Sequence, residues 1–149
     1  MVLFTEASSH AWLHVAALLL APDTMLLYLF LSAAAVPPKL TSDTFYEEVA
    51  KGRTFVFFHS PDCGHCRAML PEWEALGERS PPDGCRLGSL DVTLEPAIAD
   101  RFEVYGFPTL LLLEPSEGQM YEFRGERTVE AFSAFLEPEG FRGEVGQPR

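Results

Sequence analysis

The Cys-Gly-His-Cys motif at residues 63–66 constrains this chain of 149 residues more than any other feature. It follows an apolar run at residues 55–58 that is typical of a buried strand, and it opens a segment with helical periodicity. Two thiols three positions apart at the start of a helix lie one turn from each other, within disulfide reach. The unpaired N–H groups and partial positive charge of a helix N-terminus favour a thiolate over a thiol. The motif therefore predicts thiol–disulfide exchange.

The spacing of apolar residues after the motif assigns a role to each sulfur. Steps of three, four, seven and ten from Cys66 lead to Met69, Leu70, Trp73 and Leu76. This periodicity predicts that Cys66 lies on the inward face of the helix and that Cys63 lies at its tip. We interpret Cys63 as the attacking nucleophile. Cys66 is then the resolving thiol that displaces a bound partner from a mixed disulfide.

Two residues of the motif region act on Cys63 in opposite directions. His65 can hydrogen-bond to the thiolate, or pair with it when protonated, and so stabilises the reduced form. Asp62 directly precedes Cys63 and competes for the positive end of the helix dipole, which raises the pKa of the thiol. The sequence does not decide which effect is larger.

Other uses of two cysteines at this spacing are less well supported. A zinc site needs four ligands, and the others would have to come from Cys85, His59 or another histidine at no recognised spacing. A purely structural disulfide stays open. A c-type haem attachment site is excluded because Arg67, not histidine, follows Cys66. The expectation is therefore no metal and no cofactor.

Several segments together resemble a known family. The stretch from Phe57 to Arg67, followed by Pro71-Glu72-Trp73, resembles the active-site segment of the thioredoxin-like catalytic domains of protein disulfide isomerases. The later segments at residues 90–93, 105–109 and 123–127 match that family's landmarks in order and at similar intervals. The resemblance covers roughly residues 37 to 138. It implies a single catalytic domain with a Cys63–Cys66 redox disulfide.

The resemblance also implies a substrate-binding loop. In the family, the proline of the segment matching Gly106-Phe107-Pro108 is cis and lies against the active-site disulfide. The backbone just before that proline can pair with an extended substrate. Gly106, Phe107 and Pro108 are therefore expected to bind substrate. Tyr105 and Phe107 flank this loop and would form an apolar contact patch.

Three positions depart from the family pattern. The family usually has a tryptophan before the first cysteine, a buried glutamate six residues before it, and an arginine before the Gly-aromatic-Pro segment. Here these positions hold Asp62, Phe57 and Tyr105. Since the buried acid is thought to move protons to and from the inner cysteine, its replacement implies slow or altered turnover at Cys66.

Composition indicates one folded domain without a nucleic-acid partner. Hydrophobic residues make up 47% of the chain and charged residues 22%, as in a globular domain. The formal net charge of −11 argues against binding a phosphate backbone, which needs a basic surface. About 113 residues remain after the first 36, enough for one core and too few for two.

The N-terminal 36 residues differ from the rest of the chain. Two apolar runs, at residues 11–21 and 25–36, precede the first basic residue, Lys39. Each run has the length of a signal-peptide core and is shorter than a membrane span. We interpret residues 1–36 as a signal peptide or a membrane anchor, residues 37–138 as a thioredoxin-like domain and residues 139–149 as a flexible tail. The last five residues are not a retention signal of the KDEL type.

Hydrophobic patterning predicts a three-layer α/β sandwich with a mixed central sheet and helices on both faces, and the resemblance implies that this sandwich is thioredoxin-like. Helices are expected at about 43–51, 63–78, from 96 and from 128, and strands near Lys39 and at about 54–59, 86–91, 109–113 and 120–123. Thr44 with Glu47 fits a capping box. The last two strands are expected to form a hairpin at the sheet edge. Cys85 is expected to be a buried small hydrophobe, and His59 a solvent-facing or hydrogen-bonded histidine.

Two functions fit the sequence. The first is a thiol–disulfide oxidoreductase of the protein disulfide isomerase type, which forms, reduces or rearranges disulfides in cysteine-containing client proteins of the endoplasmic reticulum lumen or secretory pathway. The second is a redox-weak client-binding or adaptor domain, which the replaced residues Asp62, Phe57 and Tyr105 favour. The sequence does not distinguish oxidase from reductase or isomerase. It also names neither the clients nor the redox donor or acceptor.

Overall fold

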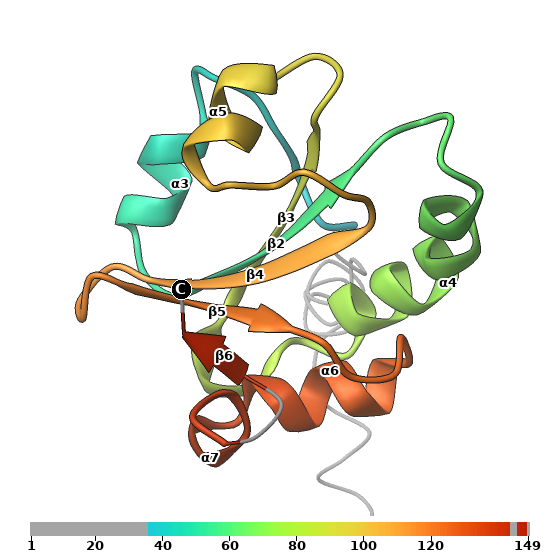
Figure 1. Cartoon of the computed structure of the whole chain (residues 1–149). Helices are drawn as coiled ribbons and strands as arrows, with labels where there is room; N and C mark the ends of the chain where they lie inside the picture. Colours follow the sequence, from blue (N-terminus) through green and yellow to red (C-terminus); the bar gives the residue numbers. More distant parts are fainter. Residues whose placement is uncertain (1–35, 144–145, 149) are drawn as a thin grey trace, which may run out of the picture. The chain divides into compact units, whose positions relative to one another are not determined.

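The computed structural model describes residues 36–143 and 146–148, which form a six-stranded sheet with helices on both faces (Figure 1). In chain order the elements are β1 (Lys39–Leu40), α3 (Phe45–Ala50), β2 (Thr54–His59), α4 (Gly64–Glu78), the 3₁₀ turn η1 (Pro82–Gly84), β3 (Arg86–Asp91), α5 (Pro96–Arg101), β4 (Thr109–Glu114), β5 (Gln119–Phe123), α6 (Val129–Leu136), α7 (Pro138–Phe141) and β6 (Gly146–Pro148). The strand order is β1-β3-β2-β4-β5-β6. The expected elements up to residue 136 are all present, in the expected order.

Strand β2 lies at the centre of the sheet and separates two hydrophobic cores. It pairs in parallel with β3 and antiparallel with β4, and it is buried as its continuous apolar run predicted. Its side chains alternate between faces: Phe55 and Phe57 join the core under α4 and α6, whereas Val56 and Phe58 join the core under α3 and α5. The fold is thus the expected thioredoxin-like three-layer sandwich with a mixed sheet.

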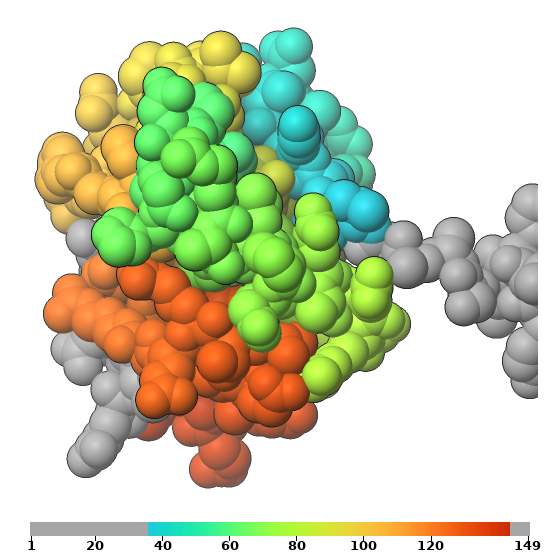
Figure 2. Space-filling view, turned by 90° about the vertical axis from the view of Figure 1, so that its right-hand side faces the viewer, coloured from blue at the N-terminus to red at the C-terminus, as the bar shows by residue number. Residues whose placement is uncertain are grey.

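Helix α4 carries the cysteine motif and covers one side of the sheet. Figure 2 shows it (green) between the start of the described chain (cyan) and the C-terminal helices (orange and red). Cys66, Met69, Trp73 and Leu76 are all buried on the inward face that their spacing predicted. Leu70, expected on the same face, is instead 37% exposed at the edge of that face.

Side-chain capping differs between the helix N-termini. Thr128 caps α6, because its Oγ1 accepts a hydrogen bond from the backbone N–H of Ala131 at 3.3 Å. The capping box predicted from Thr44 and Glu47 is wrong. The hydroxyl of Thr44 instead accepts a hydrogen bond from the backbone N–H of Thr41 at 3.0 Å and leaves α3 without a side-chain cap.

The flexible tail predicted for residues 139–149 is wrong for much of its length. Residues 138–141 form α7, and Phe141 is fully buried against Tyr121, with a ring-centroid distance of 5.1 Å. Residues 146–148 form β6, which pairs antiparallel with β5. In the described sheet β5 is therefore not the edge strand that the hairpin pattern predicted. A single phenylalanine among charged, proline and glycine residues gave no periodic signal for this segment.

No helix within the described ranges is long and apolar enough to cross a membrane. The signal peptide or anchor predicted for residues 1–36 falls almost entirely outside those ranges. It therefore stays a prediction.

Candidate active site

The two cysteines of the motif meet at the N-terminus of α4. Cys63 is the N-cap residue, with extended backbone angles, and Cys66 lies in the first turn. A disulfide joins them across a Cα–Cα distance of 5.2 Å. Cys66 is only 2% exposed and belongs to the core, whereas Cys63 is half-buried. An incoming sulfur atom therefore has better access to Cys63 than to Cys66.

The helix end provides a direct stabilising contact for the Cys63 sulfur. The backbone N–H of Cys66 donates a hydrogen bond to Sγ of Cys63 at 3.1 Å. This is a side-chain N-cap with sulfur in place of the usual oxygen. An N–H group at the positive end of a helix binds a thiolate more strongly than a disulfide sulfur, because the bond to the charged form is charge-assisted. The geometry thus favours the reduced, ionised form of Cys63.

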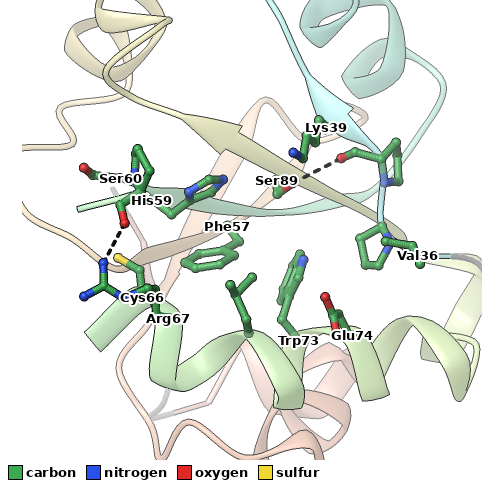
Figure 3. Close-up of a pocket in the computed structure, with 14 residues that line it drawn as sticks. Val36, Lys39, Phe57, His59, Ser60, Cys66, Arg67, Trp73, Glu74 and Ser89 are labelled. Atoms are coloured by element: carbon green, nitrogen blue, oxygen red, sulfur yellow. Dashed lines mark hydrogen bonds between the residues drawn. The ribbon is translucent and has the colours of Figure 1, made fainter. Parts of the chain in front are cut away.

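The loop before Cys63 is held by hydrogen bonds to its own backbone. The carbonyl of Ser60 accepts from the backbone N–H of Cys63 at 3.2 Å, and the carbonyl of Pro61 accepts from Nη1 of Arg67 at 2.8 Å (Figure 3). Asp62 and His65 both lie exposed beside Cys63. Their predicted opposing effects on its thiol stay predictions.

The expected substrate-binding loop lies against the disulfide. The peptide bond between Phe107 and Pro108 is cis, as the resemblance implied, and the carbonyl oxygen of Phe107 lies 3.8 Å from Sγ of Cys63. Two hydrogen bonds support the loop, from Oγ1 of Thr109 to the carbonyl of Gly106 at 2.8 Å and from Nη2 of Arg127 to the carbonyl of Pro108 at 3.4 Å. The loop thus places the backbone of Phe107, which lies between Gly106 and Pro108 in the chain, beside Cys63.

Two aromatic side chains give this region an apolar surface. Tyr105 is 81% exposed and Phe107 is 43% exposed. Large apolar side chains at such exposure are common at interaction sites when they gather beside polar groups. Both side chains of the expected apolar contact patch are therefore exposed, and their role in binding stays a prediction.

A cavity of about 620 Å³ has Cys66 in its wall (Figure 3). Its walls include Cys66, Trp73 and Phe57, and Phe57 is fully buried between the rings of Trp73 and His59 at 5.5 and 5.0 Å. Phe57 pairs in register with Ser89 of β3, which also lines the cavity. At the position where the family has a buried glutamate, this chain thus has the apolar ring of Phe57, in the same cavity wall as the resolving cysteine.

The third cysteine does not take part in this site. Cys85 is free, buried in the core under α4 and α6, and donates from Sγ to the carbonyl of Arg86 at 3.5 Å. Burial raises the pKa of its thiol to about 12. Cys85 is thus the buried small hydrophobe that its position predicted. In the described part of the chain, no group of three or more histidine, cysteine, aspartate or glutamate side chains could hold a metal ion.

Comparison with known proteins identifies the fold family. The family model for thioredoxin matches residues 36–138. The chain belongs to the thioredoxin family. Its sequence is 41% identical over 98 residues to a thioredoxin domain-containing protein of Theileria parva, covering 65% of this chain and 43% of that protein. It is 37% identical over 109 residues to human protein disulfide-isomerase A2, covering 70% of this chain and 20% of that protein.

Solved structures agree with this assignment. The thioredoxin domain superposes on the first thioredoxin domain of mouse protein disulfide-isomerase A4 with a TM-score of 0.58 and 28% identity, covering 68% of this chain and 76% of that one. The matching curated relatives are longer: this chain spans less than half the length of the Theileria protein and a fifth of the human one. Together these findings identify an oxidoreductase-type thioredoxin domain with protein disulfide isomerase relatives and a paired Cys-x-x-Cys motif.

Some contacts of the thioredoxin domain were not predicted from the sequence. Glu72 accepts a hydrogen bond from the backbone N–H of Val129 at 2.8 Å and so links α4 to the start of α6. Arg67 donates a hydrogen bond to the carbonyl of Pro61, and Arg127 donates one to the carbonyl of Pro108. Both arginines lie in the segments that carried the family resemblance, but only the folded chain shows which carbonyls they reach.

Proposed function

We propose that this thioredoxin domain forms, reduces or rearranges disulfides in client proteins of the secretory pathway. The observation that carries the proposal is the 3.1 Å hydrogen bond from the Cys66 N–H to Sγ of Cys63, at a helix tip beside an exposed apolar loop. This arrangement stabilises a thiolate at a place that a protein-sized partner can reach. Cys63 and Cys66 are the proposed catalytic residues, with His65 beside them.

The reaction proceeds through a mixed disulfide. When the domain oxidises a client, a client thiolate attacks Sγ of Cys63, the Cys63–Cys66 bond breaks and Cys66 leaves as a thiolate. A second client thiolate then attacks the client sulfur of the mixed disulfide, a client disulfide forms and Cys63 leaves. When the domain reduces a client, Cys63 attacks first and Cys66 then closes the ring, which releases the client as a dithiol. Each direction transfers two electrons.

The apolar loop is the proposed client-binding surface. An extended client segment can lie beside Phe107 and Tyr105, whose exposed rings would contact its apolar side chains. The carbonyl of Phe107, 3.8 Å from Sγ of Cys63, is then a backbone acceptor close to the reacting sulfur. Binding through backbone and general apolar contacts suits many different clients, which disulfide exchange in folding proteins requires.

The proposed location is the endoplasmic reticulum lumen or another part of the secretory pathway. The protein disulfide isomerase relatives and the apolar runs before residue 36 support this proposal. Disulfides form and persist in such oxidising compartments.

Three assays test the proposed function. The reduced domain should catalyse insulin reduction and the reactivation of scrambled ribonuclease, and Cys63→Ser should abolish both activities. Cys66→Ala should accumulate mixed disulfides with clients, because the resolving thiol is missing. Wild-type protein with no activity above that of an equal concentration of free dithiol would contradict the proposal.

A client-binding or adaptor role is the second candidate. It is favoured by Phe57, which places an apolar ring beneath Cys66 where the resemblance implies an acid, and by the change at Tyr105. In this case the domain would retain clients without turning them over. Binding of a reduced, unfolded client by wild type and by Cys63→Ser with equal affinity, together with inactivity in the three assays, would support the adaptor role.

A further inference from the structure

Two cavities meet at His59. The first is the 620 Å³ cavity that contains Cys66 in its wall. The second, of about 150 Å³, has Asp91 and Glu95 in its wall. His59, Lys39 and Ser89 line both cavities, so His59 borders the cavity of the resolving cysteine and also the cavity that holds these two carboxylates.

Chemistry at Cys66 requires a proton acceptor in the first cavity. Cys66 must lose its proton before it attacks a mixed disulfide, and it gains one after it leaves as a thiolate. At 2% exposure its sulfur does not exchange protons freely with bulk water, and burial itself disfavours the thiolate. Phe57, in the wall of the same cavity, has no group that can accept a proton.

Among the titratable side chains in the wall of this cavity, His59 is the one suited to the task. The others are Lys39, Arg67 and Glu74, all exposed at the rim. A lysine or arginine stays protonated and a glutamate stays ionised near neutral pH, whereas an imidazole changes its protonation state between about pH 5 and 8.

The surroundings of His59 lower its pKa, so its imidazole is neutral and can accept a proton near pH 7. Burial lowers its pKa, the carboxylate of Asp91 acts in the opposite direction, and Lys39 adds a further lowering. Asp91 is the register partner of His59 on β3, and Lys39 comes from β1. Arg67 and Glu74 of α4 face the first cavity, and Glu95 faces the second. His59 is therefore neutral at pH 7.

The first cavity has the size and the polar groups to hold water. Its volume exceeds that of several water molecules, and the buried indole N–H of Trp73 in its wall has no acceptor among the described residues. Buried donors of this kind are usually satisfied by water. A short chain of water molecules would connect the Cys66 sulfur with the imidazole.

We propose that His59 carries protons between the Cys66 sulfur and solvent through water in these two cavities. During ring closure the Cys66 proton passes through water to the imidazole. The thiolate then attacks Sγ of Cys63, the Cys63–Cys66 bond forms and the client sulfur leaves as a thiolate. The imidazolium releases its proton through the second cavity. When the disulfide is reduced, the imidazole takes up a proton through the second cavity and passes it through water to the Cys66 thiolate.

This proposal rests on the proposed dithiol exchange, and single-turnover kinetics separate the two. The reduced domain reacts with 5,5′-dithiobis(2-nitrobenzoate) in two steps. The first equivalent of thionitrobenzoate reports attack by Cys63, and the second reports ring closure by Cys66. Cys85 is buried and reacts more slowly than both. If wild type releases no second equivalent, the proposed function fails; if it does, the second step tests His59.

The pH profile of ring closure gives the first result. In wild type the rate of ring closure should rise with pH and reach a plateau. The pKa of His59 is lowered from 6.5, so the plateau should begin at a pH below that value. In His59→Gln, closure at pH 7 should slow by about 10²-fold and rise by about tenfold per pH unit, while attack by Cys63 is unchanged. A wild-type profile without a bend, or a His59→Gln profile identical to that of wild type, would overturn the proposal.

A matched pair of double variants separates proton transfer from a structural effect. Phe57→Glu combined with His59→Gln places a carboxylate in the wall of the same cavity and should restore ring closure at neutral pH. Phe57→Gln combined with His59→Gln has almost the same shape without a proton acceptor and should stay slow. Equal closure rates in the two double variants would overturn the proposal, since shape alone would then explain the effect of His59.

Discussion

Nε of Arg53 donates a hydrogen bond to Oε2 of Glu114 at 2.6 Å and joins the residue before β2 to the last residue of β4. Glu114 is 6% exposed and Arg53 is half-buried, so this is a partly buried ion pair at the end of the sheet. Arg53 also reaches Asp83 at 2.9 Å and lies 4.8 Å from the ring centre of Phe141. One guanidinium thus connects the sheet with η1 and with α7.

Removing the charge of Glu114 should destabilise the domain in a pH-dependent way. Burial alone would raise the pKa of Glu114, but the hydrogen bonds from Arg53 and Ser116 outweigh it and hold the pKa below 4.5. Glu114→Gln should therefore lower the free energy of unfolding by about 2 kcal/mol at pH 7. A carboxyl group with a lowered pKa contributes stability above pH 4.5 and loses it as the pH falls, so the difference between wild type and variant should shrink below that pH.

Urea unfolding at pH 7 and at pH values below 4.5 measures this effect. The matched control is Glu130→Gln, which removes the exposed ion pair between Glu130 and Arg79. The control should change the free energy of unfolding much less than Glu114→Gln does, because exposed ion pairs contribute little to stability. Equal destabilisation by the two variants would show that burial of the Arg53–Glu114 pair has no energetic consequence.

The C-terminal helix should contribute to stability despite its shortness. Phe141 is fully buried and touches Tyr121, Phe135 and the guanidinium of Arg53. Phe141→Ala should therefore cost about 3 to 5 kcal/mol of unfolding free energy. Phe107→Ala, at a side chain that is 43% exposed, is the control and should cost much less. A neutral Phe141→Ala would restore the flexible-tail prediction.

The exposed side chain of Tyr105 should affect the reaction of the domain with protein clients and not its reaction with small thiols. Because its ring is 81% exposed beside the binding loop, Tyr105→Ser should raise the KM for a protein disulfide several-fold and leave the reaction rate with glutathione unchanged. Tyr46→Ser is the control, because Tyr46 lies on α3, across the sheet from α4. Identical KM values for wild type and Tyr105→Ser would exclude Tyr105 from client binding.

Cys85 should be inert while the domain is folded. With burial raising the pKa of its thiol to about 12, almost no thiolate is present at neutral pH. Treatment of the reduced domain with iodoacetamide at pH 7, followed by peptide mass spectrometry, should find Cys63 modified first and Cys85 modified only after denaturant is added. Rapid modification of Cys85 in native protein would contradict its place in the core.

Local patterns predicted most of the fold and the central part of the site. The apolar run of β2 and the helical spacing after Cys66 are properties of short segments, and the structure places them as expected. The cap predicted at Thr44 is absent because its hydroxyl accepts from the backbone N–H of Thr41 instead, a competition that the capping pattern does not contain. The burial of Phe141 depends on Arg53 and on β5, both distant in the sequence.

The position of His59 illustrates what the sequence does not contain. Its place at the end of β2 followed from the strand pattern, but the two cavities arise where α4, β1 and β3 pack around it. The replacement of the family's buried acid by Phe57 was visible from the resemblance. Only the folded chain shows that His59 is a titratable group in the same cavity.

The hydrogen bond at the tip of α4 stabilises the thiolate of Cys63. The most direct measurement is the rate of iodoacetamide alkylation of Cys63 in the reduced domain as a function of pH, followed by mass spectrometry of the peptide that contains it. The account predicts an inflection below about pH 7.5. An inflection at about pH 8.5 or above, the value of an ordinary cysteine, would contradict it.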